Sequence, residues 1–238
     1  MRKLPWLLWF VTLAMPLSGL AAQGRVGGSL VLTSDYRSHG VSQTDGEPAL
    51  QADLHYDTPD GWFAGGWATN YTLYGAENRT VELNAFLGHR WRLANDWSAK
   101  LMLSHYAHPW DERAQHYDYD EMTAATAWRD QLFFSASWSP NYALASSHGF
   151  SLNKSAIAYD ATARVPLRGS FSGVAGVGYY DLSDLVGRSY WYGSAGLVYD
   201  MPSVHVEVSR VLSSGVAREL YYGGVADDCW AATLMWTF

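Results

Sequence analysis

The sequence predicts an all-β protein, a transmembrane up-and-down antiparallel β-barrel of about 12 strands that follows a cleaved signal peptide. Three features favour this fold: an aromatic strand at the C-terminus, alternation of short and long connections, and alternation of apolar and polar residues within the strands. Together they describe strands with one face in lipid and the other in an enclosed lumen.

The last strand alternates apolar residues at Trp230, Ala232, Leu234, Trp236 and Phe238. A free edge strand of this kind invites aggregation, whereas in a closed barrel it pairs with the first strand. The ending resembles the C-terminal signal of bacterial outer-membrane barrels, which carry an outward-facing aromatic. We therefore predict that Phe238 is the assembly signal, with the barrel-assembly machinery and outer-membrane lipid as partners.

The other terminus has the pattern of a secretory signal peptide over residues 1–22. A basic start at Arg2 and Lys3 precedes an apolar run over residues 4–17 and small residues at 18–22. This run is shorter than the roughly 20 residues of a membrane-spanning helix, which argues against the alternative of an N-terminal anchor. Cleavage after Ala21 or Ala22 leaves residues 23–238 as the barrel domain.

Composition supports a membrane barrel and excludes several other classes. The chain of 238 residues has 16 Tyr and 12 Trp, more than a soluble core needs but suited to interfacial aromatic girdles. A net charge of −7 argues against nucleic acid as a partner. Cys229, the single cysteine, excludes an intramolecular disulfide and a cysteine-based metal site. We expect no cofactor.

Strand-like segments recur at the spacing of a barrel. The predicted strands are residues 29–38, 49–57, 62–71, 80–91, 97–106, 119–128, 132–138, 155–165, 170–180, 190–199, 203–211 and 229–238. Tight turns alternate with long connections at residues 39–48, 72–79, 107–118, 139–154, 181–189 and 212–228. Outer-membrane barrels show this alternation because their periplasmic turns are short and their extracellular loops are long.

Parity separates the two faces of most strands. In residues 49–57, for example, Leu50 and Leu54 fall on one face and Asp53 on the other. An Arg or Lys facing lipid would cost about 2–4 kcal/mol near the bilayer midplane, so the charged residues are predicted to face the lumen. The parity of residues 62–71 stays open. The predicted pore-lining residues are Asp35, Arg37, Asp53, Glu82, Arg90, Lys100, Glu121, Asp160, Arg164 and Glu207.

Within the first strand, Asp35 and Arg37 are expected about 7 Å apart on the lumenal face. That separation is too long for a direct hydrogen bond. Each is therefore predicted to pair with a charge on a neighbouring strand, for example Asp53 or a residue of the closing strand.

The predicted lumen admits two functions. Its mixed charges have an acidic excess, which favours cations in a narrow channel for small hydrophilic solutes. The same charges could pair and plug the lumen, because about 12 strands lies between the filled 8-stranded and open 16-stranded barrels. The alternative is therefore a non-conducting barrel with a structural or lipid-hydrolase role.

No arrangement of residues indicates catalysis or a metal site. His205, Glu207 and Ser209 resemble a triad, but alternate residues of a strand lie about 7 Å apart and a Ser–His pair needs about 2.6–3.2 Å. We therefore predict that the protein is not an enzyme. Acidic and histidine residues around the third long connection could bind a divalent cation, but without recognisable ligand spacing a solvated loop is the simpler interpretation. These residues are His105, His108, Asp111, Glu112, His116, Asp118 and Asp120.

One segment carries a family resemblance. Residues 34–44 read SDYRSHGVSQT and are followed by Pro48-Ala49-Leu50-Gln51. This pattern resembles the signature of the TorF family of porins, although that family has an aromatic residue where this chain has Ser38. Weaker matches continue along the mature chain. The resemblance implies a transport pore without a defined substrate, in the outer membrane of a Gram-negative bacterium.

Overall fold

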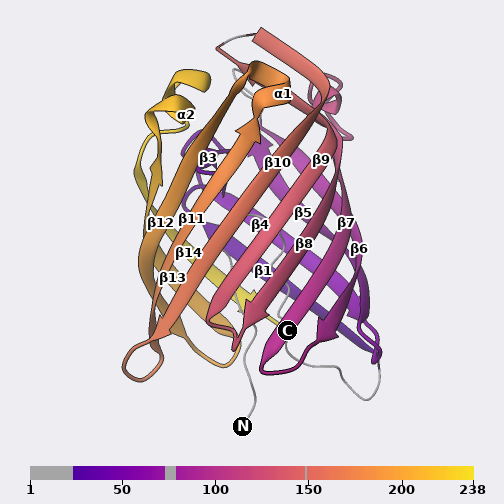
Figure 1. Cartoon of the computed structure of the whole chain (residues 1–238), viewed down its shortest axis with the longest axis vertical. Helices are drawn as coiled ribbons and strands as arrows, with labels where there is room; N and C mark the ends of the chain where they lie inside the picture. Colours follow the sequence, from indigo (N-terminus) through magenta and orange to yellow (C-terminus); the bar gives the residue numbers. More distant parts are fainter. Residues whose placement is uncertain (1–23, 73–78, 148) are drawn as a thin grey trace.

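The computed structural model describes residues 24–72, 79–147 and 149–238, and the predicted signal peptide lies outside these residues. Twelve strands of the described chain close into an antiparallel barrel in which each strand pairs with its neighbours in chain order. The barrel closes where β14 pairs with β1. Figure 1 shows the strands tilted steeply around the barrel wall. The predicted all-β barrel is confirmed.

The strands of the barrel are as long as membrane-spanning strands or longer. Their bounds are β1 Arg25–Thr33, β4 Ala49–Asp57, β5 Trp62–Thr72, β6 Arg79–Arg92, β7 Trp97–Ala107, β8 Tyr119–Trp128, β9 Leu132–Ser146, β10 Gly149–Pro166, β11 Phe171–Leu182, β12 Arg188–Asp200, β13 Val204–Ser213 and β14 Cys229–Thr237. Five short elements are not part of the barrel wall. They are the two-stranded sheet β2 (Arg37–Ser38) and β3 (Val41–Ser42), and the helices η1 (Ala114–Tyr117), α1 (Ser183–Val186) and α2 (Gly215–Leu220).

Two predictions about the strands are wrong. The first strand ends at Thr33 rather than residue 38, because the chain turns out of the wall at Ser34 and Asp35. The predicted long connection at 139–154 is instead an extension of β9 and β10. Its Ser, Asn and Gly residues indicated a loop, but the two strands stay paired almost to their tip, with register shifts near Lys154.

The two faces of the wall differ as the sequence predicts. The outward side chains of Leu50 and Leu54 are 62% and 57% exposed, while Asp53 between them is buried. The open parity of β5 is also settled: Trp62 is outward and exposed, whereas Trp67 is buried on the inner face. Positions five apart on a strand lie on opposite faces, which explains why Trp occurs on both.

The two ends of the barrel differ. One end, called here the short-turn end, carries the tight turns together with Arg25 of β1 and Phe238. The opposite end, the long-loop end, carries the long connections and helices α1 and α2 (Figure 1). Among the described residues, no helix is long and apolar enough to cross a membrane.

Large side chains fill much of the barrel interior. One buried cluster joins Phe63, Trp67, Phe86 and Met102 of the wall to Tyr36 of the first connection. A second cluster lies at the long-loop end around Tyr180, Tyr190 and Tyr192 and includes Val41 of β3. The first connection is therefore packed between two apolar clusters of the interior.

Candidate functional site

The first connection folds back into the barrel as a hairpin over residues 34–44, called here the inward hairpin. Ser34 still donates its backbone N–H to the carbonyl of Ala232 on β14. The chain then forms β2 and β3, in which Arg37 pairs with Ser42. His39 and Gly40 make the turn with φ of 50° and 79°, a left-handed conformation that glycine adopts readily.

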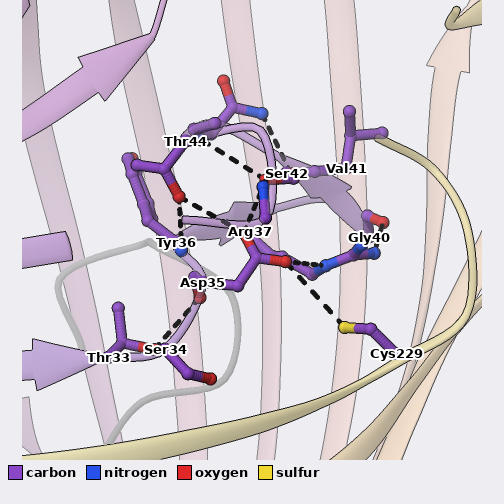
Figure 2. Close-up of polar contacts among 12 residues, drawn as sticks. Thr33, Ser34, Asp35, Tyr36, Arg37, Gly40, Val41, Ser42, Thr44 and Cys229 are labelled. Carbon is purple, nitrogen blue, oxygen red and sulfur yellow. Dashed lines mark hydrogen bonds and ion pairs between the residues drawn. The ribbon is translucent and has the colours of Figure 1, made fainter. Parts of the chain in front are cut away.

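Asp35 is the centre of the hairpin, as Figure 2 shows. Its Oδ2 lies 2.6 Å from Arg37 Nε, and its Oδ1 accepts hydrogen bonds from Ser42 Oγ at 2.5 Å and Thr44 Oγ1 at 3.3 Å. Arg37 also donates to the carbonyl of Gly40 at 2.8 Å. Cys229 at the start of β14 places its thiol 3.9 Å from the same carboxylate.

The predicted separation of Asp35 and Arg37 is therefore wrong. It assumed that both residues belong to one extended strand, but the strand ends before them. The two charges pair with each other and not with a neighbouring strand. Asp53, the predicted partner, instead contacts His55 Nδ1 at 2.8 Å.

The inward hairpin contacts the barrel wall on two opposite sides of the lumen. On one side, Gly40 accepts a hydrogen bond from Ser213 Oγ of β13 at 2.8 Å, and His39 stacks on Tyr180 of β11 with ring centroids 4.1 Å apart. On the other side, the Tyr36 hydroxyl donates to Glu82 Oε1 of β6 at 3.2 Å. Since β11 and β6 lie four and three strands from β1 around the barrel, the hairpin spans the lumen.

Contact at the tip of the hairpin leaves no room for a side chain at Gly40. A Cβ atom there would lie 2.5 Å from Ser213 Oγ and 2.7 Å from Tyr192 Cβ. Glycine is therefore required by the close approach to the wall as well as by its backbone conformation.

Most of the predicted pore-lining residues are buried, and several lie in charge pairs. Arg90 Nη1 contacts Asp57 Oδ1 at 2.8 Å, and Arg164 pairs with Asp200. Lys100 is only 6% exposed. Each of these two pairs joins strands that are separated by one other strand of the wall, near the short-turn end of the barrel.

The remaining predicted carboxylates bond to hydroxyl groups of the inner face. Asp160 accepts from the Tyr192 hydroxyl at 2.6 Å. Glu121 accepts from Thr123, and Glu207 accepts from Ser209, each at 3.0 Å. The triad-like residues do not act together either, because Ser209 bonds to Glu207 while His205 lies 2.5 Å from Asp200.

Four of the acidic and histidine residues around the third long connection form two separate histidine–carboxylate pairs, while Asp111 pairs with Arg113. His105 pairs with Asp120 at 2.8 Å on the exposed surface. His108 is buried, with Nδ1 3.0 Å from Asp118 and Nε2 3.4 Å from Glu82. Among the described residues, no three His, Cys, Asp or Glu side chains are grouped to hold a metal ion.

The environment of His108 affects its protonation. Burial acts to lower the pKa of His108, but hydrogen bonds and charges from Glu82 and Asp118 outweigh it and raise the pKa above the ordinary histidine value. The charged imidazolium is thus stabilised where the third connection meets the wall.

A cavity of about 440 Å³ lies at the long-loop end, over the inward hairpin, and is called here the tyrosine vestibule. Its aromatic lining residues are His39, Tyr71, Tyr117, Tyr142, Tyr180, Tyr190, Tyr221 and Tyr222. They come from the hairpin, four strands of the wall, η1 and the last connection. The sequence pattern did not predict this site, although its lining residues Tyr180 and Tyr190 both lie on the inner face of their strands near the long-loop end.

Residues 19–233 match the family described as "Bacterial protein of unknown function (Gcw_chp)". The chain belongs to this family. No curated protein sequence matches the Gcw_chp chain.

Solved structures similar to the Gcw_chp chain include two porins. The NanC porin has 12% sequence identity and a TM-score of 0.54, with 88% of this chain and 97% of that chain covered. The KdgM porin has 6% identity and a TM-score of 0.52, with 90% of this chain and 98% of that chain covered. At these identities the similarity shows the fold, a porin-like β-barrel.

Proposed function

We propose that the protein is an outer-membrane channel for small hydrophilic solutes, in which the inward hairpin narrows a charged lumen. The observation that carries this proposal is the span of the hairpin from Glu82 on β6 to Tyr180 on β11. A segment that crosses the lumen and contacts two opposite sides of the barrel wall would determine which solutes pass.

Several features support a location in the outer membrane of a Gram-negative bacterium. The barrel has the architecture of porins, its outer face is apolar, and its sequence begins with a predicted signal peptide. Membranes are crossed only by helices or closed barrels, because every backbone polar group must be satisfied. The resemblance of residues 34–44 to the TorF family of porins points the same way.

The chemistry of the lumen favours cationic over anionic solutes. The predicted lining includes the acidic groups Asp53, Glu82 and Glu121, of which Glu82 contacts the hairpin through Tyr36, whereas Arg37 is held by Asp35. An acidic excess along a narrow path attracts cations.

A second candidate function is that of a non-conducting barrel. The observation that favours it is the burial of the lining charges, because Arg164, which pairs with Asp200, and Glu207 are only 6% and 5% exposed. Eight-stranded barrels are filled in this way, so a 12-stranded barrel with large inward aromatics can be sealed as well. A lipid-hydrolase role has less support, since His205 and Ser209 bond to separate carboxylates.

Conductance in planar bilayers tests the proposal. The wild-type protein is compared with a variant in which residues 36–46 are replaced by a short Gly/Ser linker, which suffices because β1 and β4 are paired neighbours. Small, weakly cation-selective conductance in the wild type and larger conductance in the variant support a channel constricted by the hairpin. If both correctly folded proteins are silent, wall side chains seal the lumen and the second function is preferred.

A further inference from the structure

The tyrosine vestibule has the properties of a ligand-binding site. Its volume of about 440 Å³ lies within the roughly 300–1,000 Å³ of small-molecule pockets, and it is enclosed by aromatic side chains with a few polar groups, as such pockets are. Tyr180 and Tyr190 form a buried wall, while Tyr71, Tyr117, Tyr142 and Tyr221 are half-buried and Tyr222 is exposed at the rim.

Four tyrosine rings of the vestibule contact one another in a continuous series. Tyr142 and Tyr190 each meet Tyr180 edge to face, with ring centroids 6.1 and 5.8 Å apart, and Tyr221 meets Tyr190 in the same way at 6.0 Å. Edge-to-face packing holds each ring in a fixed orientation. The surface is therefore preorganised and does not need to assemble around a ligand.

Charged groups are scarce among the described lining residues of the vestibule. No Lys or Arg is among its described lining residues, and the single carboxylate, Asp45, is exposed at the rim. Burial lowers the pKa of His39 to about 4, so this imidazole is neutral at pH 7. Among these described residues an anionic ligand would find no cation, and an organic cation would find a carboxylate only at the edge.

Neutral polar groups are plentiful. The phenol hydroxyls are joined by the side chains of Ser38, Gln43 and Thr72 in the lining. A hydroxyl both donates and accepts hydrogen bonds, so such a lining suits a ligand that carries hydroxyl groups around its edge.

We propose that the tyrosine vestibule binds a neutral saccharide. The apolar C–H faces of a sugar ring would pack on the tyrosine rings, and its hydroxyl groups would bond to the phenol, Ser38 and Gln43 side chains. Since Ser38 and His39 belong to the inward hairpin, a bound sugar would rest directly on the segment that narrows the lumen. The inference goes beyond the proposed function, because binding does not require the lumen to conduct.

Titration calorimetry on the folded protein in detergent micelles tests the inference. The probe is maltotriose, with lactose and cellobiose as further neutral saccharides, and galacturonate and choline as anionic and cationic comparisons. We expect at least one neutral saccharide to bind, and neither charged compound to bind more tightly than it. Tighter binding of choline or galacturonate, or no binding of any neutral saccharide at millimolar concentration, would overturn the proposal.

Two variants locate the binding. Tyr117→Ala lies in η1, outside the wall, and should weaken saccharide binding about tenfold because one aromatic contact is lost. The matched control is Tyr179→Ala, since Tyr179 neighbours Tyr180 in the sequence but packs against Trp191 on the outer face of the barrel. Equal affinity in the wild type and in Tyr117→Ala would show that the saccharide does not bind in the tyrosine vestibule and would overturn the proposal.

Conductance recorded on the same preparations separates the two proposals. Saccharide binding by a barrel that never conducts would support the saccharide site and contradict the proposed channel. Conductance by a barrel that binds no saccharide would support the channel and contradict the saccharide site.

Discussion

Asp35 Oδ2 and Arg37 Nε lie 2.6 Å apart inside the barrel, in a segment where an uninterrupted strand would have placed both residues in the wall. Both side chains are nearly buried, and the same carboxylate also accepts from Ser42 and Thr44. One acidic group thus holds both arms of the inward hairpin. The motif of residues 34–44 is, in this structure, the sequence of a folded lumenal segment.

The first prediction concerns this carboxylate. Asp35→Asn keeps the size of the side chain but leaves the buried guanidinium of Arg37 without its counter-charge. Breaking a buried ion pair from one side costs about 3–5 kcal/mol, so we expect the hairpin to detach. Hydrogen exchange at the backbone N–H of Gln43, which bonds to the carbonyl of Tyr36, reports this change. Asp45→Asn, an exposed acid of the same connection, is the control and should exchange like wild type.

The second prediction separates backbone strain from steric contact. Gly40 and Gly46 have nearly equal φ of 79° and 76°, so alanine at either position costs about 1–2 kcal/mol of backbone energy. Only at Gly40 would the new Cβ meet neighbours, while at Gly46 no atom lies within 4 Å. Gly40→Ala should therefore expose the hairpin to protease, and Gly46→Ala should not. Equal digestion of the two variants would mean that the tip contacts at Ser213 and Tyr192 do not hold the hairpin.

The third prediction is a pH dependence of the third connection. The pKa of His108 is raised in the folded protein, and the groups facing it are Glu82, Asp118 and the ring of Tyr71. A group with a raised folded pKa contributes stability that is complete below its unfolded pKa of about 6.5 and is lost as the pH rises through the folded value. Cleavage of this connection by protease should thus be slower at pH 6 than at pH 9.

The variant His108→Gln should abolish that difference, because glutamine does not titrate. His116→Gln changes an exposed histidine of the same connection and should keep it. A pH difference that survives His108→Gln would assign the effect to another group.

The fourth prediction concerns the charge pairs of the inner face. Arg164→Met leaves Asp200 with His205 alone and should cost about 3–5 kcal/mol. The measurement is the temperature at which the folded band on unheated gels is lost. Arg168→Met, at an exposed arginine of the adjacent turn, is the control. If the two variants melt at the same temperature, the Arg164–Asp200 pair does not stabilise the barrel. In that case, an effect of Arg164→Met on ion selectivity would support an open lumen.

The wall of the barrel was predictable because alternation and turn residues act locally. The predicted bounds of β4 and β8 are the observed ones. β4 is the clearer case, since it runs between Pro48 and the turn at residues 58–61 and alternates along most of its length. The end of β1 was not predictable in this way. Residues 34–38 continue an acceptable strand pattern, and only contacts with residues distant in the sequence, such as Ser213 and Tyr180, place them inside the lumen.

The candidate site was harder to predict than the fold for the same reason. Inward charges follow from parity, but their partners come from strands far along the chain, as with Arg90 and Asp57. The tyrosine vestibule is assembled from the ends of several strands and three connections, so no single segment carries its signal. The pattern that could have indicated the vestibule is the presence, in several strands, of tyrosines that face inward near the same end of the barrel.

The last prediction tests the terminal aromatic. Phe238 exchanges backbone hydrogen bonds with Gly28 of β1, and its ring covers the space where a side chain at Gly28 would lie. The ring is also outward and more than half exposed, as expected of a signal read by the assembly machinery. Phe238→Asp removes the ring but keeps the backbone bonds, so we expect a large loss of folded protein from the outer membrane fraction. Phe171→Asp changes an exposed aromatic at the same end of the barrel and controls for a lipid-facing charge. Equal losses in the two variants would show that the charge, and not the missing terminal aromatic, is the cause.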